Sequence, residues 1–265
     1  MTLVIKIGGQ GAEDPKGRKD LARQIAALRR SGHRVVVVHG GGKALTRTLD
    51  RLGIGTEFYQ GLRVTNAETR DVAVMVLAGL VNKQWVSDLE AQGQRALGIS
   101  GGDGGMVQAR KLTLGSNGSR KDLGFVGRPS RVKTDVLELA LRAGLVPVVA
   151  SLGVSARGEF LNINADDLAA ALAVALAADR LFYLTESGGV WDVDKRLLPV
   201  VKVSDIRRMI RQGVVKDGMI PKLLSCARTL RQDVGEVDIL STTAKNALLG
   251  AMQRGKTAGT RIVKG

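Results

Sequence analysis

The sequence contains few cysteine, proline and aromatic residues. It contains one cysteine, five prolines and 3% aromatic residues among 265. A single cysteine excludes an internal disulfide framework and is typical of a reducing compartment. No apolar stretch reaches the roughly 20 residues that a membrane span needs, and the strand-like start of the chain indicates no signal peptide. We therefore expect a cytoplasmic protein without a membrane segment.

The residues that are plentiful point to a globular α/β protein. Hydrophobic residues make up 44% of the chain and there are 34 glycines, so the core must consist mainly of Val, Leu, Ile and Ala, with many tight turns. The length allows one large domain or two lobes that share a sheet. Cys226 lies in an apolar run, and we expect it to be a small core residue rather than a nucleophile.

The formal net charge of +15 requires an explanation. Basic surfaces bind nucleic acid through its phosphates, but here the basic residues are dispersed and lack the interleaved aromatic residues that stack on bases. An enzyme with a polyanionic nucleotide and an acidic substrate would also benefit from a positive field. A genome-wide drift toward basic residues, with no function, is the remaining alternative. We expect no specific nucleic-acid partner.

Strand patterns alternate with helix patterns along almost the whole chain. Residues 35–38 are four consecutive valines, typical of a strand covered on both faces. Strands are expected at 3–7, 34–38, 95–100, 146–150, 181–185, 237–241 and 261–263. Helices are expected at 19–30, 43–52, 67–89 (with a break near Asn82), 134–143, 165–178, 203–211, 220–231 and 245–252. Hairpins are expected at 106–127 and around 156–159.

This alternation predicts a three-layer αβα sandwich around a mostly parallel open sheet. We place a lobe boundary near residue 177, which divides the chain into residues 1–177 and 178–265, although no linker composition marks it.

Two glycine turns follow predicted strands, where an open α/β sheet binds small anions. Lys6 precedes Gly8 and Gly9, and His39 precedes the three glycines 40–42. Glycine lets backbone N–H groups approach a phosphate closely, and a lysine beside them adds a point charge. Each turn alone could equally be a solvated loop. We expect His39 to be structural.

Charged residues near other predicted turns suggest further parts of an anion site. Asp166 and Asp167 begin a helix that Asn164 can cap, and only one of these acids can point inward. An acid between two lysines would fix their ammonium groups. It need not act as a base, because a carboxylate nucleophile is already ionised at neutral pH. Arg63 could clamp a substrate carboxylate in a bidentate pair; an exposed surface arginine is the alternative. The glycine-rich turn at 100–105 could face a ligand or simply be flexible.

Taken in order, seven segments resemble the acetylglutamate kinases of the amino acid kinase family over nearly the whole chain. The segments are Lys-Ile-Gly-Gly at 6–9, His-Gly-Gly-Gly at 39–42, Gly-Leu-Arg-Val-Thr at 61–65, Leu-Gly-Phe-Val-Gly at 123–127, Asn-Ile-Asn-Ala-Asp at 162–166, Asp-Gly-Met-Ile-Pro-Lys at 217–222 and Gly-Thr-Arg-Ile at 259–262. The resemblance implies ATP-dependent phosphorylation of the side-chain carboxylate of N-acetyl-L-glutamate, the second step of arginine biosynthesis.

The resemblance also implies roles for individual residues. Lys6 and Lys222 would neutralise the transferring phosphoryl group from opposite sides, and Asp166 would orient both. The residues implied in substrate binding are Gly41, Gly42, Arg63 and Asn162. Those implied in ATP binding are Gly8, Gly9, Thr185, Glu186, Ser187, Gly188, Gly189, Val190, Val214, Val215 and Lys216. Mg²⁺ would be carried mainly by the nucleotide phosphates rather than by a protein metal site.

Two positions depart from the family pattern. Glu186 stands where the family usually has aspartate, which leaves the nucleotide contacts open. Gly102 stands where a lysine often precedes Asp103, which removes one phosphate contact. These departures are the only support for a non-catalytic member that senses nucleotide or acetylglutamate, and retention of the two lysines and Asp166 speaks against it.

A second alternative is a kinase of carrier-protein-linked aminoadipate in lysine biosynthesis. The positive charge would suit an acidic carrier, but such relatives tend to lack the third glycine, Gly42.

Arginine-inhibited members carry a helix before the first strand and use it to form hexamers. Its absence implies an arginine-insensitive homodimer. The helix at 67–89 is a candidate dimer interface, with Val72, Val76, Leu80 and Val81 on one side. Ordinary packing of this side in the core is the alternative.

Overall fold

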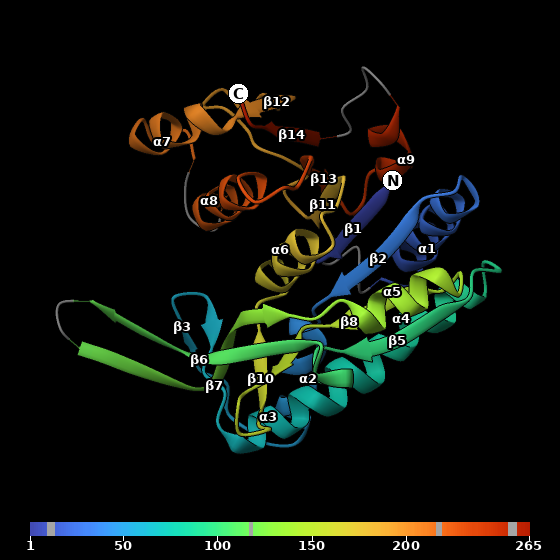
Figure 1. The fold of residues 1–265 in the computed structure, drawn as a ribbon. Helices are drawn as coiled ribbons and strands as arrows, with labels where there is room; N and C mark the ends of the chain where they lie inside the picture. Colours follow the sequence, from blue (N-terminus) through green and yellow to red (C-terminus); the bar gives the residue numbers. More distant parts are fainter. Residues whose placement is uncertain (10–13, 117–118, 216–218, 254–258) are drawn as a thin grey trace.

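The computed structural model describes residues 1–9, 14–116, 119–215, 219–253 and 259–265 (Figure 1). An eight-stranded sheet runs through the molecule, and every neighbouring pair is parallel except β13 with β14. In spatial order the strands are β12 (Val200–Lys202), β14 (Gly259–Val263), β13 (Glu236–Ser241), β11 (Arg180–Thr185), β1 (Thr2–Ile7), β2 (Arg34–His39), β8 (Val146–Ala150) and β5 (Ala96–Ser100). The predicted mostly parallel sheet is confirmed. The short strand β12 was not predicted.

Helices cover both faces of the sheet, as the three-layer prediction requires. One face packs against α1 (Pro15–Arg30), α4 (Asn82–Glu90) and α9 (Ala247–Met252). The other packs against α5 (Asp135–Arg142), α6 (Ala165–Ala175), α7 (Val203–Arg211) and α8 (Met219–Leu230). Cys226 is buried in this second layer, as predicted. In the described part of the chain, no helix is both long and apolar enough to cross a bilayer.

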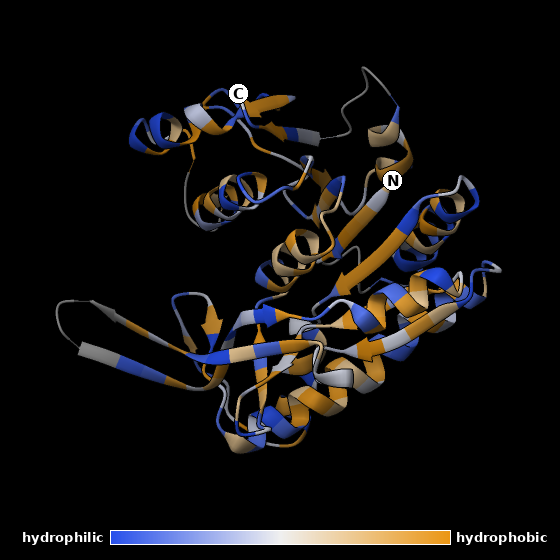
Figure 2. Ribbon diagram, viewed as in Figure 1, coloured by the Kyte–Doolittle hydropathy of each residue, from blue (hydrophilic) through white to orange (hydrophobic). Residues whose placement is uncertain are grey.

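The alternation of side chains along β1 decides where its lysine points. Leu3, Ile5 and Ile7 pack in the layer that contains α1, whereas Val4 packs in the layer that contains α6. Successive side chains in a strand point to opposite faces, so Lys6 shares the face of Val4. Figure 2 shows β1 and β2 as apolar strands in the middle of the fold. Lys6 is therefore a charged residue at the end of a buried strand, on the side of α6.

A small closed barrel adjoins the sheet, and its strands come from the predicted hairpins. It consists of β6 (Val107–Ser116), β7 (Ser119–Val132), β9 (Leu152–Val154) and β10 (Phe160–Ile163). The hairpin of β6 and β7 protrudes from the molecule (Figure 1), as predicted, and β7 continues beyond the expected end. A two-stranded sheet of β3 (Phe58–Tyr59) and β4 (Leu62–Arg63) lies nearby.

The predicted long helix is one rod with wide turns in its middle. It consists of α3 (Ala67–Ala73), the π-helix η2 (Val74–Val81) and α4, so the expected break near Asn82 is a change of helix type. Wide turns alter which residues face the core. Val72 and Val76 are buried, whereas Leu80 is 53% exposed. The prediction that these residues share one side with Val81 is wrong, because the π-helix changes the helical phase between them.

Candidate active site

Three charged residues from distant parts of the sequence meet at the carboxyl end of β1. Lys6 leaves β1, Asp166 lies in the first turn of α6, and Lys222 lies in the first turn of α8. The Nζ atom of Lys6 is 2.8 Å from Oδ1 of Asp166, and the Nζ atom of Lys222 donates to Oδ2 of the same carboxylate. The structure thus brings together the three residues predicted for catalysis.

The two lysines determine the charge state of Asp166. Burial alone would raise the pKa of this carboxyl group, but the ammonium groups of Lys6 and Lys222 outweigh burial and lower the pKa to about 2. Asp166 is therefore ionised at neutral pH, hydrogen-bonded to Lys222 and ion-paired with Lys6. A group with this pKa is a fixed counter-charge and not a general base.

Asn164 and Tyr183 hold the backbone of Asp166 in place. The side chain of Asn164 caps α6 by accepting a hydrogen bond of 2.8 Å from the backbone N–H of Asp166, as predicted. The hydroxyl group of the buried Tyr183 donates to the backbone oxygen of Asp166 at 3.3 Å. The Nζ atom of Lys222 lies 5.1 Å from the centroid of the Tyr183 ring, within range of a cation–π interaction.

The first glycine turn gives the Lys6 side chain room to fold back. A Cβ atom on Gly8 would lie 2.2 Å from Nζ of Lys6, and Gly9 has a φ of +83°. A side chain at Gly9 would also meet Glu186, whose Cγ lies 2.7 Å from the position of such a Cβ atom. Both positions therefore need glycine, one for space and one also for its backbone conformation.

The second glycine turn opens a helix without a side-chain cap. Gly41 is the N-cap of α2 (Gly42–Arg51), and among the described side chains none accepts a hydrogen bond from this helix start. A Cβ atom on Gly41 would lie 2.8 Å from Leu77, and its φ of +157° disfavours other residues. The first N–H groups of α2 are thus available to an anion, with the positive end of the helix dipole behind them.

Two cavities flank this glycine turn. One, of about 270 Å³, is lined by Arg63, Asn162 and Asp166. The other, of about 260 Å³, is lined by Gly8, Gly9, Lys43 and Trp85, among others. Lys6 and the glycines 40–42 line both. A group transferred between ligands in the two cavities would pass Lys6.

Arg63 is anchored inside its cavity, so the surface-arginine alternative is wrong. The residue is 8% exposed, and its Nη2 donates to Oγ1 of Thr46 at 2.7 Å and to the backbone oxygen of Gly42 at 3.2 Å. Nη1 donates to Oγ1 of Thr56 at 3.1 Å, and the guanidinium carbon lies 4.6 Å from the centroid of the Phe58 ring. Burial lowers the pKa of Arg63 below its usual value, but an arginine remains charged near neutrality.

Asn162 and Ser151 line the same cavity as Arg63. Nδ2 of Asn162 lies 3.4 Å from Oγ1 of Thr65, which in turn donates to the backbone oxygen of Arg63. The predicted substrate residues Gly41, Gly42, Arg63 and Asn162 therefore surround one space.

Thr185 and Glu186 are the predicted nucleotide residues that reach the first glycine turn. Ile7 pairs with Leu184, and the N–H of Gly8 donates to the backbone oxygen of Leu184 at 3.2 Å, so the next residues of β11 lie beside Gly8 and Gly9. Oε1 of Glu186 is 3.5 Å from Nζ of Lys43. The glutamate thus links β11 to the start of α2.

Apart from Gly8 and Gly9, none of the predicted nucleotide residues that the structure describes lines either cavity. The hydroxyl groups of Ser187 and Thr185 are 3.2 Å apart, and Gly188 and Gly189 form the next turn with positive φ. Val190 is buried, and its N–H donates to Oγ1 of Thr260. Val215 is buried and Val214 packs beside it. Lys216 lies outside the described residues.

The third glycine turn and His39 are packed inside the protein. A Cβ atom on Gly102 would lie 2.4 Å from Cε1 of Phe160, so a lysine at this position would displace the ring. His39 is buried, as predicted for a structural residue. Burial lowers its pKa to about 4, although a hydrogen bond to the backbone of Gly40 opposes the effect. Nδ2 of Asn82 lies 3.0 Å from Nε2 of His39.

Sequence reasoning missed several residues of the site. Lys43 follows the three glycines directly, and this position was a usable signal for an anion contact. Phe58, Thr46 and Thr56, which hold Arg63, and Tyr183, which lies under Lys222, follow no pattern that would have identified them. Their positions depend on tertiary packing.

The chain is similar to known proteins in both sequence and structure. The sequence profile of the amino acid kinase family matches residues 1–241. The acetylglutamate kinase of Methylobacterium nodulans is 45% identical over 266 residues, covering 98% of this chain and 88% of the relative. That of Koribacter versatilis is 45% identical over 267 residues, 99% of each chain. The solved structure of smu.665 from Streptococcus mutans is 32% identical, has a TM-score of 0.82 and covers 100% of this chain and 99% of its own.

Proposed function

Because the chain belongs to the amino acid kinase family, we propose that it transfers the γ-phosphoryl group of ATP to the side-chain carboxylate of N-acetyl-L-glutamate. The product is N-acetyl-L-glutamyl 5-phosphate, and the reaction is the second step of arginine biosynthesis. The observation that carries the proposal is the Lys6–Asp166–Lys222 cluster beside a cavity that contains a buried arginine.

In this reaction a carboxylate oxygen of the substrate attacks the γ-phosphorus while the bond to the β,γ-bridging oxygen breaks, so that ADP leaves. Both reactants are anions, and the transferring group carries negative charge on its equatorial oxygens. Lys6 and Lys222 supply positive charge on two sides of that group. Asp166 holds the two ammonium groups in position, and no proton has to be removed, because the attacking carboxylate is ionised.

We assign the cavity of Arg63 to the acylated amino acid. Arg63 would pair with the α-carboxylate, since its Nε–H takes part in none of the hydrogen bonds that anchor its Nη atoms. Asn162 would bind the acetamido group, and the amides of Gly41 and Gly42 would contact the reacting carboxylate. These residues line one cavity, and a buried arginine is suited to binding a carboxylate with two parallel hydrogen bonds.

We assign the first glycine turn and the end of β11 to ATP, with Gly8 and Gly9 at the phosphates and residues 185–190 and 214–216 toward the rest of the nucleotide. Among the described side chains, no group of three His, Cys, Asp or Glu residues is placed to hold a metal ion. Mg²⁺ would be carried mainly by the phosphates of ATP, where it offsets their charge. We place the enzyme in the cytoplasm, where ATP is available.

The test is release of ADP in a coupled assay with three acceptors side by side. We expect turnover with N-acetyl-L-glutamate and little with glutamate or aminoadipate, which lack the acetyl group. Turnover only with carrier-linked aminoadipate would favour the lysine-biosynthesis alternative. Binding of ATP and acetylglutamate without turnover of any acceptor would identify a non-catalytic sensor.

We also propose that the enzyme is a homodimer. Met75 and Leu80 on the π-helix η2 are 66% and 53% exposed, and neighbouring β5 is an edge strand of the large sheet. Exposed large apolar side chains beside an open strand are suited to a symmetric contact. Light scattering should give twice the chain mass, and Leu80→Lys should shift the protein toward monomer. A monomeric wild type at micromolar concentration would contradict the proposal.

A further inference from the structure

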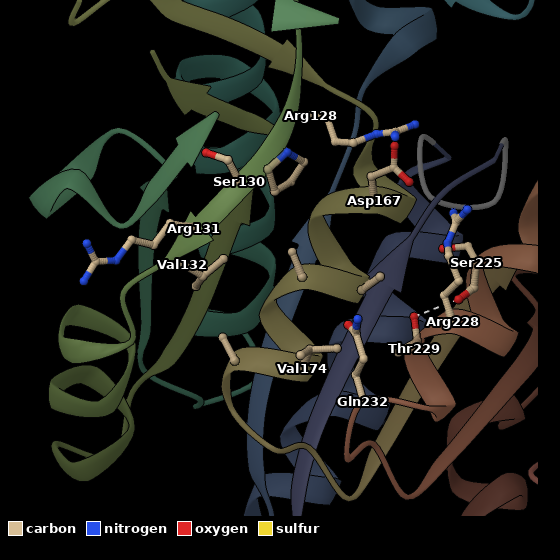
Figure 3. A pocket seen from close by; sticks show the side chains of 14 residues that line it. Arg128, Ser130, Arg131, Val132, Asp167, Val174, Ser225, Arg228, Thr229 and Gln232 are labelled. Carbon is tan, nitrogen blue, oxygen red and sulfur yellow. Dashed lines mark hydrogen bonds between the residues drawn. The ribbon is translucent and has the colours of Figure 1, made fainter. Parts of the chain in front are cut away.

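A third cavity, of about 440 Å³, lies between α6, α8 and β7 (Figure 3). The α6 side is formed by residues 167, 170, 171, 174 and 175, and the α8 side by residues 225, 228, 229 and 232. Both sets have the spacing of one helix face. Of the described residues, none lines both this cavity and either cavity of the catalytic cluster. It is thus a separate space on helices that also carry Asp166 and Lys222.

One end of this cavity is charged. Figure 3 shows Asp167 between Arg128 and Arg228, whereas Arg131 is turned away. Both guanidinium groups attract the Asp167 carboxylate, but among the described residues neither of them forms a side-chain hydrogen bond or an ion pair within 4.0 Å. Two guanidinium groups near one carboxylate leave an excess of positive charge. An arginine without a close partner beside a cavity is suited to binding an incoming carboxylate.

The rest of the cavity is mostly apolar. Ala170, Ala171 and Val174 form the α6 wall, and Val132 lies on the β7 side. Among the residues that the structure describes, no aromatic side chain lines the cavity, which disfavours a stacked nucleobase. The hydroxyl group of Thr229 is occupied, because it donates to the backbone oxygen of Ser225 at 2.9 Å. The lining therefore fits a charged head group joined to a short aliphatic chain.

We propose that this cavity binds a small carboxylate with a short aliphatic chain, whose head group pairs with Arg128 and Arg228 beside Asp167 and whose chain lies over Ala170, Ala171 and Val174. The carboxylate pairs with the two guanidinium groups, and the aliphatic part removes alanine and valine surface from water. The ligand can come from two sources. In an α-amino acid, Asp167 would also pair with the ammonium group, whereas in a simple carboxylic acid Asp167 would have no favourable contact.

The test is titration of the full-length protein, labelled at its alanine and valine methyl groups, followed by NMR. The probes are 3-methylbutanoate and L-valine, which differ only by the ammonium group, with uncharged 3-methylbutanamide as the control. We expect saturable shifts of the Ala170, Ala171 and Val174 methyl groups with a Kd of about 1 mM, as for small ligands, and none with the amide. Tighter binding of valine that Asp167→Asn abolishes would identify the amino-acid source; tighter binding of 3-methylbutanoate would identify the simple acid.

Matched variants test whether the ligand binds in this cavity. Arg228→Gln removes one pairing group and Ala171→Leu fills the apolar part without changing charge, so each should weaken binding about tenfold or more. Arg131→Gln removes the same charge from a side chain that is turned away and should leave binding unchanged. Absence of saturable shifts at about 20 mM of both probes, equal weakening by Arg131→Gln and Arg228→Gln, or full binding to Ala171→Leu would overturn the proposal.

Discussion

Asp166 is the residue on which the Lys6–Asp166–Lys222 cluster depends, because its one carboxylate is the shared partner of two ammonium groups. Neither lysine is held in this geometry by its own strand or helix alone. Lys6 and Lys222 should therefore behave as a unit in phosphoryl transfer, with each positioned partly through the same acid.

We expect Lys222→Ala to lower kcat by roughly 10²-fold, a typical loss for one electrostatic stabiliser of a transition state. Lys6→Ala should have a similar effect. The double variant should lose less than the sum of the two losses in free energy, since the residues act together. Steady-state kinetics and ATP titration of the folded variants measure this. Lys19→Ala, which removes an exposed lysine, is the control. Near-normal kcat in either single variant would mean that the catalytic centre is elsewhere.

Arg63→Lys should raise the KM for acetylglutamate about tenfold or more, with a smaller change in kcat. A lysine is a single-point donor and cannot reproduce the planar contact of a guanidinium group that Thr46, Thr56 and Phe58 hold in place. A contact made equally in the ground state and the transition state affects mainly KM. The KM for ATP should be unchanged and serves as the internal control. If neither constant for acetylglutamate changes, Arg63 is not the substrate clamp.

At the scale of elements, Asn82 joins the start of α4 to three strands. Its Nδ2 contacts Nε2 of His39 on β2 at 3.0 Å, the backbone oxygen of Val148 on β8 at 2.8 Å and that of Ile99 on β5 at 3.3 Å. The His39 ring is within 2.7 Å of the Gly40 backbone oxygen through Nδ1. Both contacts fit a neutral ring that accepts at Nε2 and donates at Nδ1. Protonation at Nε2 would place two donors against each other.

This arrangement makes stability depend on pH. The pKa of His39 is about 4 in the folded protein and about 6.5 when unfolded, so the unfolded state binds more protons between these values. The contribution of His39 is fully present above about pH 6.5 and is lost as pH falls toward 4. By linkage, the free energy of unfolding should fall by about 2 kcal/mol between pH 7.5 and pH 5.

Urea denaturation at the two pH values measures this loss. His39→Gln should abolish most of it, at the cost of lower stability at pH 7.5. Burial also lowers the pKa of His33, in a more exposed setting, so His33→Gln is the matched control and should retain most of the loss. An equal loss in wild type and His39→Gln would contradict the assignment.

At the scale of the whole molecule, the two predicted lobes share one sheet. β1 lies between β2 and β11, so a strand from the first lobe pairs with the first strand of the second. The lobes are tied again where the N–H of Asp179 donates to the backbone oxygen of Thr2 at 2.9 Å. Leu3, Ile5 and Ile7 pack in one cluster with Phe182 and Leu184. The boundary near residue 177 remains a prediction.

A fragment of residues 1–177 should therefore not fold alone. Without β11 it would expose an edge of β1 and the apolar side chains that Phe182 and Leu184 cover. We expect a poorly dispersed amide NMR spectrum for the fragment and one cooperative unfolding transition for the intact chain. Adding a fragment of residues 178–265 should restore dispersion. A well-dispersed spectrum of the first fragment alone would show that the lobe folds independently.

The sequence by itself determined the class of the fold and the order of its main elements. Period-two and helical patterns are local, so the valine strand at 35–38, the capped helix after Asn164 and the protruding hairpin could be predicted from neighbouring residues. Short motifs likewise identified Lys6, Asp166 and Lys222 as a group. The antiparallel pairing of β13 with β14, the small barrel and the short strand β12 depend on distant partners and could not be predicted in this way.

Only the tertiary structure decided how the side chains are used. Arg63 and a surface arginine have the same sequence pattern, and burial against Phe58 distinguishes them. Val72 and Leu80 fit one helical stripe until the π-helix moves Leu80 to the surface. Asp166 and Asp167 are adjacent, yet one meets two lysines and the other lies between two arginines at one end of a separate cavity. The physical reason is the same in each case: hydrogen bonds, ion pairs and burial act between residues that packing brings together from distant parts of the chain.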